Sequence, residues 1–446
     1  MTDSWMNPQG ETFSEQRGDE VEEQVPKSHD ISLLNKLLHN TLANENDLEG
    51  TLEVKQSDPN KPIFSAKTFQ ELDLNPQLLK AIRYKGYVKP SKIQEMSLPA
   101  MIKHRRDLIG QSQSGTGKTA SFTLAALSHI DADLKQLQIL VLAPTYELAL
   151  QIYDVFRSLS QFMTPLNMNC LVRGQDNSTE DLEDCQIAIG TLGTTIKLLK
   201  QRTIDLKALK MLIIDEADVM IDENASNSLL CMDIQKLCPP GCQKLLFSAT
   251  FNDEVIRLAE SSTHDPLMLR LQKKEEAVDD IKNYYFIYNT LDDKYGALSE
   301  IYSSLTIGQS IIFCKTRKGA SELSERMSKD GHAVSMLTGA LDVDQRASIM
   351  QRFRTGKERV LITTNVTARG IDVATVNLVI NYDLPLLMHQ SGTVDYETYL
   401  HRVGRTGRFG KKGIAINFIK QGELNFIRDL ENRFAIKIAS VGEILD

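Results

Sequence analysis

The sequence predicts an α/β protein with two parallel-sheet domains and a mostly disordered acidic N-terminal tail. Short apolar runs alternate with segments of helical pattern, and such runs are typical of strands buried on both faces of a parallel sheet. The runs are Leu137–Ala143, Ile187–Gly190, Met211–Asp215 and Lys244–Phe247, then Tyr284–Tyr288, Ser310–Phe313, Val360–Thr363, Leu378–Tyr382 and Ile414–Ile419. A chain of 446 residues also exceeds what one hydrophobic core usually organises.

The charge distribution sets the tail apart from the rest of the chain. Residues 1–60 carry 13 acidic and 4 basic side chains, a net charge of −9, whereas the whole chain carries −8. The remainder is therefore nearly neutral. It can bind nucleic acid through a local basic patch, but it lacks the strong positive charge of a protein that binds by electrostatics alone. We expect a tail over 1–60, a first domain over 61–270, a charged linker over 271–282 and a second domain over 283–446.

One segment of the tail has helical periodicity. Ile31, Leu34 and Leu38 would share one face of a helix over residues 31–39, with Asp30 as the N-cap. A helix this short is marginal alone in water. It is either transient or docked by its leucines into a groove of the folded core.

The cysteines and the hydropathy indicate a protein without membrane insertion in a reducing compartment. The six cysteines lack the spacing of a redox pair or a zinc site. Cys238 and Cys242 come closest to a metal motif, but only Cys231 lies upstream and no histidine is near. Buried or loop thiols are therefore favoured, and no apolar run reaches the length of a membrane span.

A phosphate loop is the strongest chemical signal in the first half. Its glycines let backbone N–H groups surround phosphates, Lys118 reaches the β and γ oxygens, and Thr119 can ligate Mg²⁺. The loop residues are Ser114, Gly115, Thr116, Gly117, Lys118 and Thr119, with Ser112 in place of the usual leading glycine. A helix after Gly117 would point its positive dipole end at the phosphates.

Acidic residues follow the apolar run at 211–215. An acidic tetrad alone is usually a solvated turn, but here it ends a predicted strand downstream of a phosphate loop. We therefore expect Asp215 to hold Mg²⁺ and Glu216 to orient or deprotonate the attacking water.

Two arginines in the second half are candidates for a catalytic role. Arg405 and Arg408 are three residues apart, and Gly404 and Gly407 permit close backbone approach. Alone, such a string is typical of a surface loop. Together with the first-half site, it predicts arginine fingers that act only when the two domains close.

These motifs, with Ser248-Ala249-Thr250, the segment 368–372 and Gln94, stand in an order that resembles the DEAD-box RNA helicases from about Phe69 to Phe418. The resemblance implies two RecA-like domains, RNA-stimulated ATP hydrolysis and local, nonprocessive opening of RNA duplexes. ATP and Mg²⁺ are the implied cofactors.

The resemblance also implies roles for single residues. Gln94 would read the adenine edge, Phe69 would cover the base and Asp372 would reach the ribose. Coupling between the nucleotide and the other domain would use Asp218, Ser248, Thr250 and Arg369. RNA sugar and phosphate would be contacted by Thr145, Thr191, Gly193, Arg346 and Thr363.

Some positions depart from the general family pattern: Tyr146, Leu192, Thr338 and Val343. Tyr146, with several other segments, is similar to the animal mRNA-export subgroup. That resemblance implies RNA, a Gle-type activator with inositol hexakisphosphate, and a cytoplasmic-filament nucleoporin as partners of a monomer. It places the protein in cytoplasm and nucleus, enriched at the cytoplasmic face of the nuclear pore, and gives the helix at 31–39 a restraining role.

Two other functions compete with an RNA-remodelling enzyme. One is an ATP-gated RNA clamp that seldom turns over, although intact Glu216, Arg405 and Arg408 favour turnover. The other is a nucleotide kinase with a phosphate loop, which leaves the second-half motifs without a role.

Overall fold

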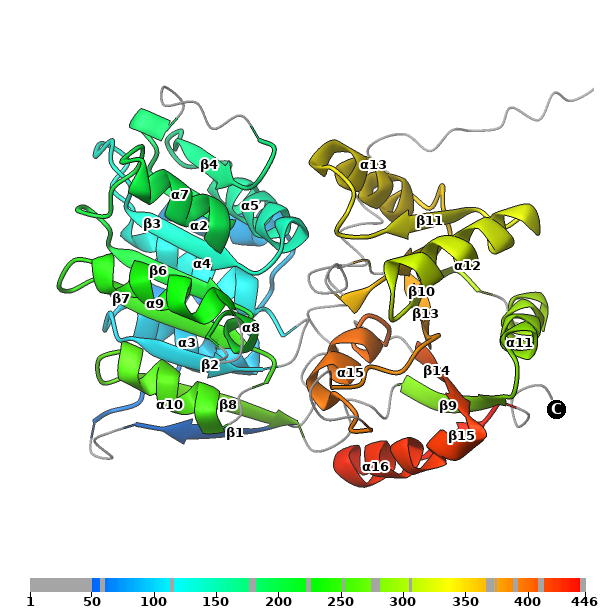
Figure 1. Cartoon of the computed structure of the whole chain (residues 1–446). Coiled ribbons are helices and arrows are strands. Elements are labelled where there is room, and N and C mark those ends of the chain that lie inside the picture. The colour runs from blue at the N-terminus through cyan, green and yellow to red at the C-terminus, as the bar shows by residue number, and fades with distance from the viewer. Residues whose placement is uncertain are drawn as a thin grey trace, which may run out of the picture.

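The computed structural model describes residues 50–56, 61–112, 116–175, 182–221, 226–250, 253–273, 281–304, 307–365, 373, 375–387, 392–407 and 413–441. These residues form two α/β units, each built on one sheet with helices on its faces (Figure 1). The prediction of two parallel-sheet domains is confirmed. The predicted helix over 31–39 lies outside the described residues.

The first sheet orders its strands, within the described residues, as β1-β8-β2-β7-β6-β3-β5-β4. They are β1 (Gly50–Lys55), β2 (Leu108–Gln111), β3 (Ile139–Ala143), β4 (Met168–Leu171), β5 (Ile187–Thr191), β6 (Met211–Asp215), β7 (Gln243–Ser248) and β8 (Leu267–Lys273). Neighbouring strands run parallel except β1, which pairs antiparallel with β8. β3 and β6 are buried throughout, because helices cover both faces.

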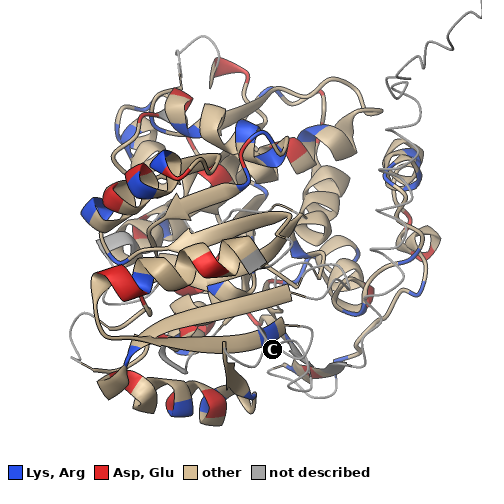
Figure 2. Cartoon of the chain, turned by 90° about the vertical axis from the view of Figure 1, so that its right-hand side faces the viewer, with Lys and Arg blue, Asp and Glu red and all other residues tan. Residues whose placement is uncertain are grey.

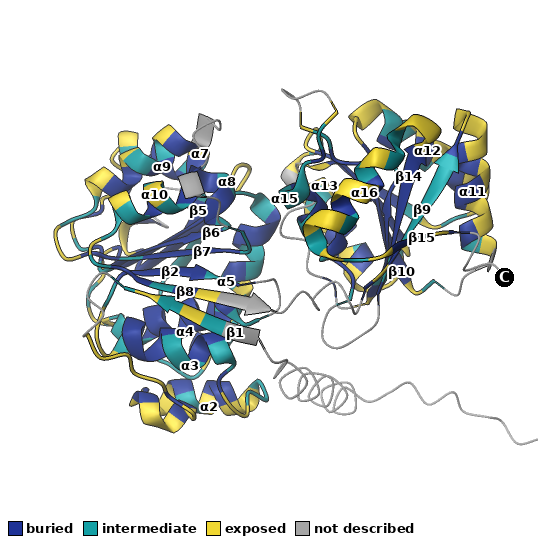
Figure 3. Cartoon of the chain, turned by 90° about the horizontal axis from the view of Figure 1, so that it is seen from below, coloured by how far each residue is buried: buried dark blue, intermediate teal, exposed yellow. Residues whose placement is uncertain are grey.

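Two helical layers enclose this sheet. One layer holds the 3₁₀ helix η1 (Phe69–Leu72), α2 (Pro76–Tyr84), α3 (Lys92–Ile102), α4 (Lys118–His129) and α5 (Tyr146–Ser160). The other holds α7 (Leu192–Lys200), α8 (Ala217–Ile221), α9 (Ser226–Leu237) and α10 (Asp253–Ser262). Alternate β3 residues serve the two layers: Val141 packs into the first core and Leu140 into the second. Figure 3 shows the buried strands between helices with exposed outer faces.

The second sheet is parallel throughout its described strands, in the order β11-β12-β10-β13-β14-β9-β15. They are β9 (Ile281–Tyr288), β10 (Gln309–Phe313), β11 (Val334–Leu337), β12 (Val360–Thr363), β13 (Val376–Asn381), β14 (Gly413–Lys420) and β15 (Ile438–Ser440). Its helices are α11 (Leu291–Ser304), α12 (Arg317–Lys329), α13 (Val343–Arg354), α15 (Tyr396–Val403) and α16 (Leu424–Phe434), with the 3₁₀ helix η3 (Gln421–Glu423) before the last.

The strand β1 differs from what the sequence predicted for its segment. β1 lies in the segment assigned to the tail, where half-buried Leu52 and Val54 alternate with exposed Glu53 and Lys55. This alternation suits an edge strand with one covered face. Its register pairs Gly50 with Lys273, so the start of β1 lies beside the last residue of β8.

The surface carries charges of both signs. Figure 2 shows acidic and basic residues intermixed on the helices, while the strands are largely uncharged. Within the described residues, no helix combines the length and apolarity needed to cross a bilayer.

Candidate active site

The predicted phosphate loop joins β2 to α4. Gly117 precedes the helix with φ +91°, in the left-handed region that favours glycine, and a Cβ there would lie 2.5 Å from Gln94 Nε2. Lys118 is buried, and its ammonium donates a hydrogen bond to the Ser112 carbonyl. The hydroxyls of Ser112 and Thr116 lie 2.7 Å apart. The positive end of α4 is therefore directed at the loop, as an anion site requires, and the expected helix after Gly117 is present.

Lys118 lies in the electrostatic field of groups from both domains. Burial lowers the pKa of its ammonium, while the carboxylates of Glu216, Asp215 and Asp218 act to raise it. The charge of Arg405, in the second domain, adds to the lowering. The candidate catalytic groups of the two halves are thus near enough to interact.

Gln94 connects α3 to the phosphate loop. Its side chain is buried; Oε1 accepts a hydrogen bond from the Ser91 amide at 2.9 Å, and Nε2 donates to the Gly117 carbonyl at 3.1 Å. The Ser91 hydroxyl donates to the Thr116 carbonyl at 2.8 Å. An amide oxygen has two lone pairs and an amide nitrogen two protons. Oε1 and Nε2 of Gln94 therefore each keep capacity for one more hydrogen bond, and the contact with an adenine edge stays a prediction.

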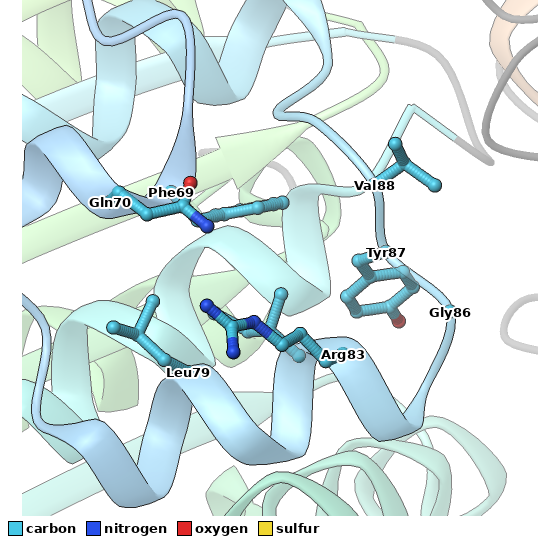
Figure 4. Close-up of a pocket in the computed structure, with 8 residues that line it drawn as sticks. Phe69, Gln70, Leu79, Arg83, Gly86, Tyr87 and Val88 are labelled. Atoms are coloured by element: carbon cyan, nitrogen blue, oxygen red, sulfur yellow. The ribbon is translucent and has the colours of Figure 1, made fainter.

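Phe69 borders a cavity of about 350 Å³ on the same side of the domain. Figure 4 shows its ring beside the cavity, with Arg83 and Tyr87 on the opposite wall. Phe69 itself is buried, and Gly86 and Val88 complete the rim between α2 and α3. The aromatic and guanidinium groups suit a flat heterocycle, but neither Gln94 nor the phosphate loop lines this cavity. A base-covering role for Phe69 therefore stays a prediction.

Asp215, the last residue of β6, and Glu216, directly after it, are held in a strained arrangement. Asp215 is buried, and burial together with the neighbouring Glu216 charge raises its pKa to about 7. Glu216 has φ +50°, a value rare outside glycine, and its amide donates to Asp215 Oδ1 at 3.0 Å. Strain of this kind persists where the surroundings enforce it, which is common at functional sites.

These residues fit the expected Mg²⁺. Burial and then the neighbouring Glu216 carboxylate raise the pKa of Asp215, and Glu216 Oε2 is buried without a hydrogen-bond partner among the described residues. Thr119 lies in the first turn of α4, half-buried. Carboxylate and hydroxyl oxygens are the ligands that Mg²⁺ prefers. Asp215 and Thr119 are therefore suited to hold it.

Asp218 joins three predicted motifs. Its Oδ2 accepts a hydrogen bond from the Thr250 hydroxyl at 2.5 Å and lies 3.4 Å from His401 Nε2 of the second domain. The Thr250 amide in turn donates to the Ser248 hydroxyl at 3.2 Å. Burial alone would raise the pKa of Asp218, but the bonds from His401, Thr250 and Ser248 hold it at about 2. The acidic tetrad thus contacts both the strand end at 248–250 and α15.

The arginines of α15 and the turn after it occupy different surroundings. Arg405 is buried, and its Nε donates to the His401 carbonyl at 2.8 Å. Arg402 is buried deeper, where its Nη1 donates to Asn381 Oδ1 at 2.9 Å and its Nε to Asn365 Oδ1 at 3.0 Å. Burial lowers the pKa of Arg402 to about 10. Arg402 therefore fixes strands of the second domain, while Arg405 lies next to the interface.

The residues expected to contact RNA lie at loop and helix starts. Thr145 caps α5 and Thr191 ends β5, and these follow neighbouring strands of the first sheet. Gly193 opens α7, with free space where a Cβ would stand. Thr363 ends β12, and its buried hydroxyl donates to the Leu337 carbonyl at 2.8 Å. Arg346, on α13, forms an ion pair with Glu147 of the first domain.

Arg346 crosses the interface to Glu147, next to Tyr146. Its Nε and Nη2 both donate to Glu147 Oε1, at 2.7 and 2.5 Å. The guanidinium carbon lies 5.8 Å from the centre of the Tyr146 ring. The tyrosine that departs from the family pattern is therefore a neighbour of the arginine expected to bind RNA.

The described residues include most of the predicted site. Five predicted residues lie outside them: Ser114, Gly115, Arg369, Asp372 and Arg408. Ser91, Glu147 and His401 are among the contacting residues that had no role in the sequence analysis. Their contacts depend on distant segments that no local pattern reveals.

Comparison with protein families gives two matches. Residues 91–258 match the DEAD/DEAH box helicase family, and residues 293–410 match the helicase conserved C-terminal domain. The chain is 49% identical to the ATP-dependent RNA helicase DDX25 of Homo sapiens over 405 residues, covering 90% of this chain and 83% of the relative. It is 46% identical to DDX19B of Homo sapiens over 410 residues, covering 91% and 84%.

Solved structures of S. cerevisiae Dbp5 are also similar. Dbp5 bound to RNA and ADP BeF3 gives a TM-score of 0.78 at 40% identity, covering 84% of this chain and 96% of that one. A Dbp5 variant bound to a Gle1 variant and IP6 gives 0.70 at 39% identity, covering 85% and 95%. A Dbp5 variant bound to Nup159, a Gle1 variant, IP6 and ADP gives 0.59 at 37%, covering 82% and 95%.

Proposed function

This chain belongs to the DEAD-box family of ATP-dependent RNA helicases, and we propose that it remodels messenger ribonucleoprotein during export from the nucleus. One observation carries the mechanism: Asp218 of the first domain and His401 of the second meet at 3.4 Å beside the phosphate loop. We infer from this contact that the nucleotide site uses both domains and that closing them would complete it.

In this mechanism the first domain binds and orients ATP. Lys118 leaves the Ser112 carbonyl to bind the β and γ phosphates, while Gln94 and Phe69 hold the adenine. Asp215 and Thr119 would hold Mg²⁺, which would supply positive charge to the phosphates. Glu216 orients or deprotonates the attacking water, using the carboxylate oxygen that is buried without a partner.

The second domain supplies the charge that completes the site. Arg405 already acts electrostatically on Lys118, and it would stabilise negative charge on the transferring phosphoryl group, together with Arg408. Asp218 and His401 would hold the domains in register for this, with Thr250, Ser248 and Arg369 in the same interface and Asp372 on the ribose. Loss of the γ phosphate would loosen the interface and release RNA.

RNA would lie across both domains. The expected contacts, Thr145, Thr191, Gly193, Arg346 and Thr363, lie at strand ends, at the N-cap of α5 and in the first turns of helices. We infer that they bind sugar and phosphate without sequence preference. The Dbp5 structure with RNA and ADP BeF3 supports this arrangement, since it has the same two-domain fold.

We further propose partners and a location from the Dbp5 structures with Gle1, IP6 and Nup159. A Gle-type activator with inositol hexakisphosphate and a cytoplasmic-filament nucleoporin would act on this chain. They would place it in cytoplasm and nucleus, with enrichment at the cytoplasmic face of the pore.

An ATPase titration separates this enzyme from an ATP-gated clamp. Purified full-length protein is expected to release phosphate faster with single-stranded RNA than with DNA or without nucleic acid. Glu216→Gln should retain ATP and RNA binding but lose the stimulated turnover. RNA binding without stimulated phosphate release in the wild-type protein would favour the clamp.

A further inference from the structure

The five-residue motif at 238–242 forms a tight turn between α9 and β7. The Cys242 amide donates to the Pro239 carbonyl at 3.1 Å, and Gly241 has φ +83°. Proline at the second position and glycine at the third are typical of a type II turn. This geometry returns the chain so that the thiols of Cys238 and Cys242 are in hydrogen-bond contact.

The two thiols differ in exposure and acidity. Cys238 is partly exposed, whereas Cys242 is buried. The hydrogen bond from Cys242 lowers the pKa of Cys238, and the Lys244 charge adds to this effect. The same contact, with burial, raises the pKa of Cys242. Cys238 is therefore the nucleophilic and reachable member of the pair.

The turn also forms one wall of a basic cavity. This cavity holds about 270 Å³ and is lined by Pro239, Pro240, Gly241 and Gln243 on one side. The other lining includes three cationic residues, Arg105, Lys207 and Lys210, and also His129, whose pKa is lowered by burial. The two cysteines flank this wall and do not line the cavity themselves. The cation that acts on the Cys238 thiol is Lys244, and a partly exposed thiol near a positive charge is the environment in which cysteines react.

We propose that Cys238 and Cys242 are a reversible oxidation site, at which a hydroperoxide converts the two thiols into an intramolecular disulfide. The Cys238 thiolate attacks one peroxide oxygen, the O–O bond breaks, and a sulfenic acid and hydroxide form. The Cys242 sulfur then displaces the sulfenic oxygen, which leaves with a proton as water. Hydrogen peroxide is reduced to two waters as two thiols become one disulfide, and a small thiol reverses the reaction by exchange.

A metal site explains these residues less well. A stable thiolate site needs about four ligands, and no third histidine, cysteine or carboxylate gathers with the pair among the described residues. The one such group found there is Glu216, Asp218 and His401, at the opposite, carboxyl edge of the sheet.

The remaining cysteines provide internal references. Cys170, Cys185, Cys231 and Cys314 are buried. Burial raises the pKa of Cys170 and of Cys314 to about 12. These thiols should oxidise more slowly than Cys238, so a selective reaction is expected.

The test uses the full-length protein treated with hydrogen peroxide, then alkylated with N-ethylmaleimide and digested with trypsin. Cleavage after Lys236 and Lys244 gives a peptide with both cysteines and no others. Mass spectrometry should show this peptide losing two hydrogen atoms and both alkylation sites, with full recovery after dithiothreitol. The other four cysteines should stay alkylated.

Two variants and a control make the outcome decisive. Cys242→Ser should accumulate a sulfenic acid at Cys238 that dimedone traps, whereas Cys238→Ser should show neither product. Cys314→Ser, in the other domain, should behave as wild type. Sulfinic acid at Cys238 with Cys242 still alkylated, or equal oxidation of all six thiols, would overturn the proposal.

Discussion

Arg346 of α13 and Glu147 of α5 form a buried ion pair that joins the two domains. Nε and Nη2 of Arg346 both bind Glu147 Oε1, while Glu147 Oε2 is buried without a partner among the described residues. The Arg346 side chain is 16% exposed and the Glu147 side chain is 3% exposed. Removing one partner of such a pair leaves an uncompensated buried charge, which is destabilising. Glu147 therefore stabilises Arg346 in its position at the interface.

Glu147→Gln should therefore weaken RNA-dependent closure. Hydrogen bonds to a charged group contribute about 1.5–3 kcal/mol, which corresponds to roughly 10- to 150-fold. We expect the RNA concentration for half-maximal ATPase stimulation to rise by about this factor, while ADP binding to the first domain is unchanged. Glu322→Gln, in an exposed pair with Lys318, is the matched control. Tighter RNA binding by Glu147→Gln would mean that the carboxylate instead competes with RNA phosphate for Arg346.

The Asp218 contacts predict an acid dependence of stability. Because the folded-state pKa of about 2 lies below the unfolded value of about 3.9, ionised Asp218 stabilises the fold by about 2 kcal/mol above pH ~4. This contribution should be lost as the pH falls through the folded pKa. The difference in unfolding free energy between wild type and Asp218→Asn, measured by urea denaturation, should shrink from pH 7 toward pH 3. Asp205→Asn, at an exposed position, should show no such trend; a constant difference for Asp218→Asn would contradict the assignment.

Gly117→Ala should impair the nucleotide site. A side chain at φ +91° costs about 1–2 kcal/mol, and its Cβ would displace the Gln94 amide. We expect weaker binding of a fluorescent ADP analogue and a lower melting temperature of the first domain. Gly296→Ala, in the exposed side of α11 with no neighbour within 4 Å of its Cβ, should instead raise stability by about 0.5–1 kcal/mol. Equal ADP affinity in Gly117→Ala and wild type would show that the loop tolerates the side chain.

The tail can be removed in two steps. Deleting residues 1–45 removes the segment 31–39 but retains β1, and it should raise RNA-independent ATPase if that segment restrains closure. The register of β1 supports such a role, since Gly50 lies opposite Lys273, at the point where the first sheet leads toward the second domain. An unchanged basal rate would remove the restraining role.

Deleting residues 1–56 also removes β1. Because Leu52 and Val54 pack against the first core, this longer deletion should destabilise the first domain by about 1–3 kcal/mol, measured by thermal unfolding. A stability equal to that of the 1–45 deletion would mean that β1 contributes little to the sheet.

The sequence by itself determined the fold class, the two-domain plan and the phosphate chemistry. Continuous apolar runs such as Met211–Asp215 became central strands, because burial on both faces leaves no polar position in the pattern. The glycine and lysine at 117–118 likewise have a local meaning, set by backbone dihedrals and the start of a helix.

Tertiary structure alone decided which groups meet. Asp218 and His401, 183 residues apart, and Glu147 and Arg346, 199 apart, contact only because two sheets face each other across an interface. The edge strand β1 pairs with β8, at the far end of its domain, and Arg402 is buried where it contacts Asn365 and Asn381. The hydrophobic periodicity of a segment indicates which of its faces are buried. Which other segment buries them depends on packing between parts of the chain that are distant in sequence.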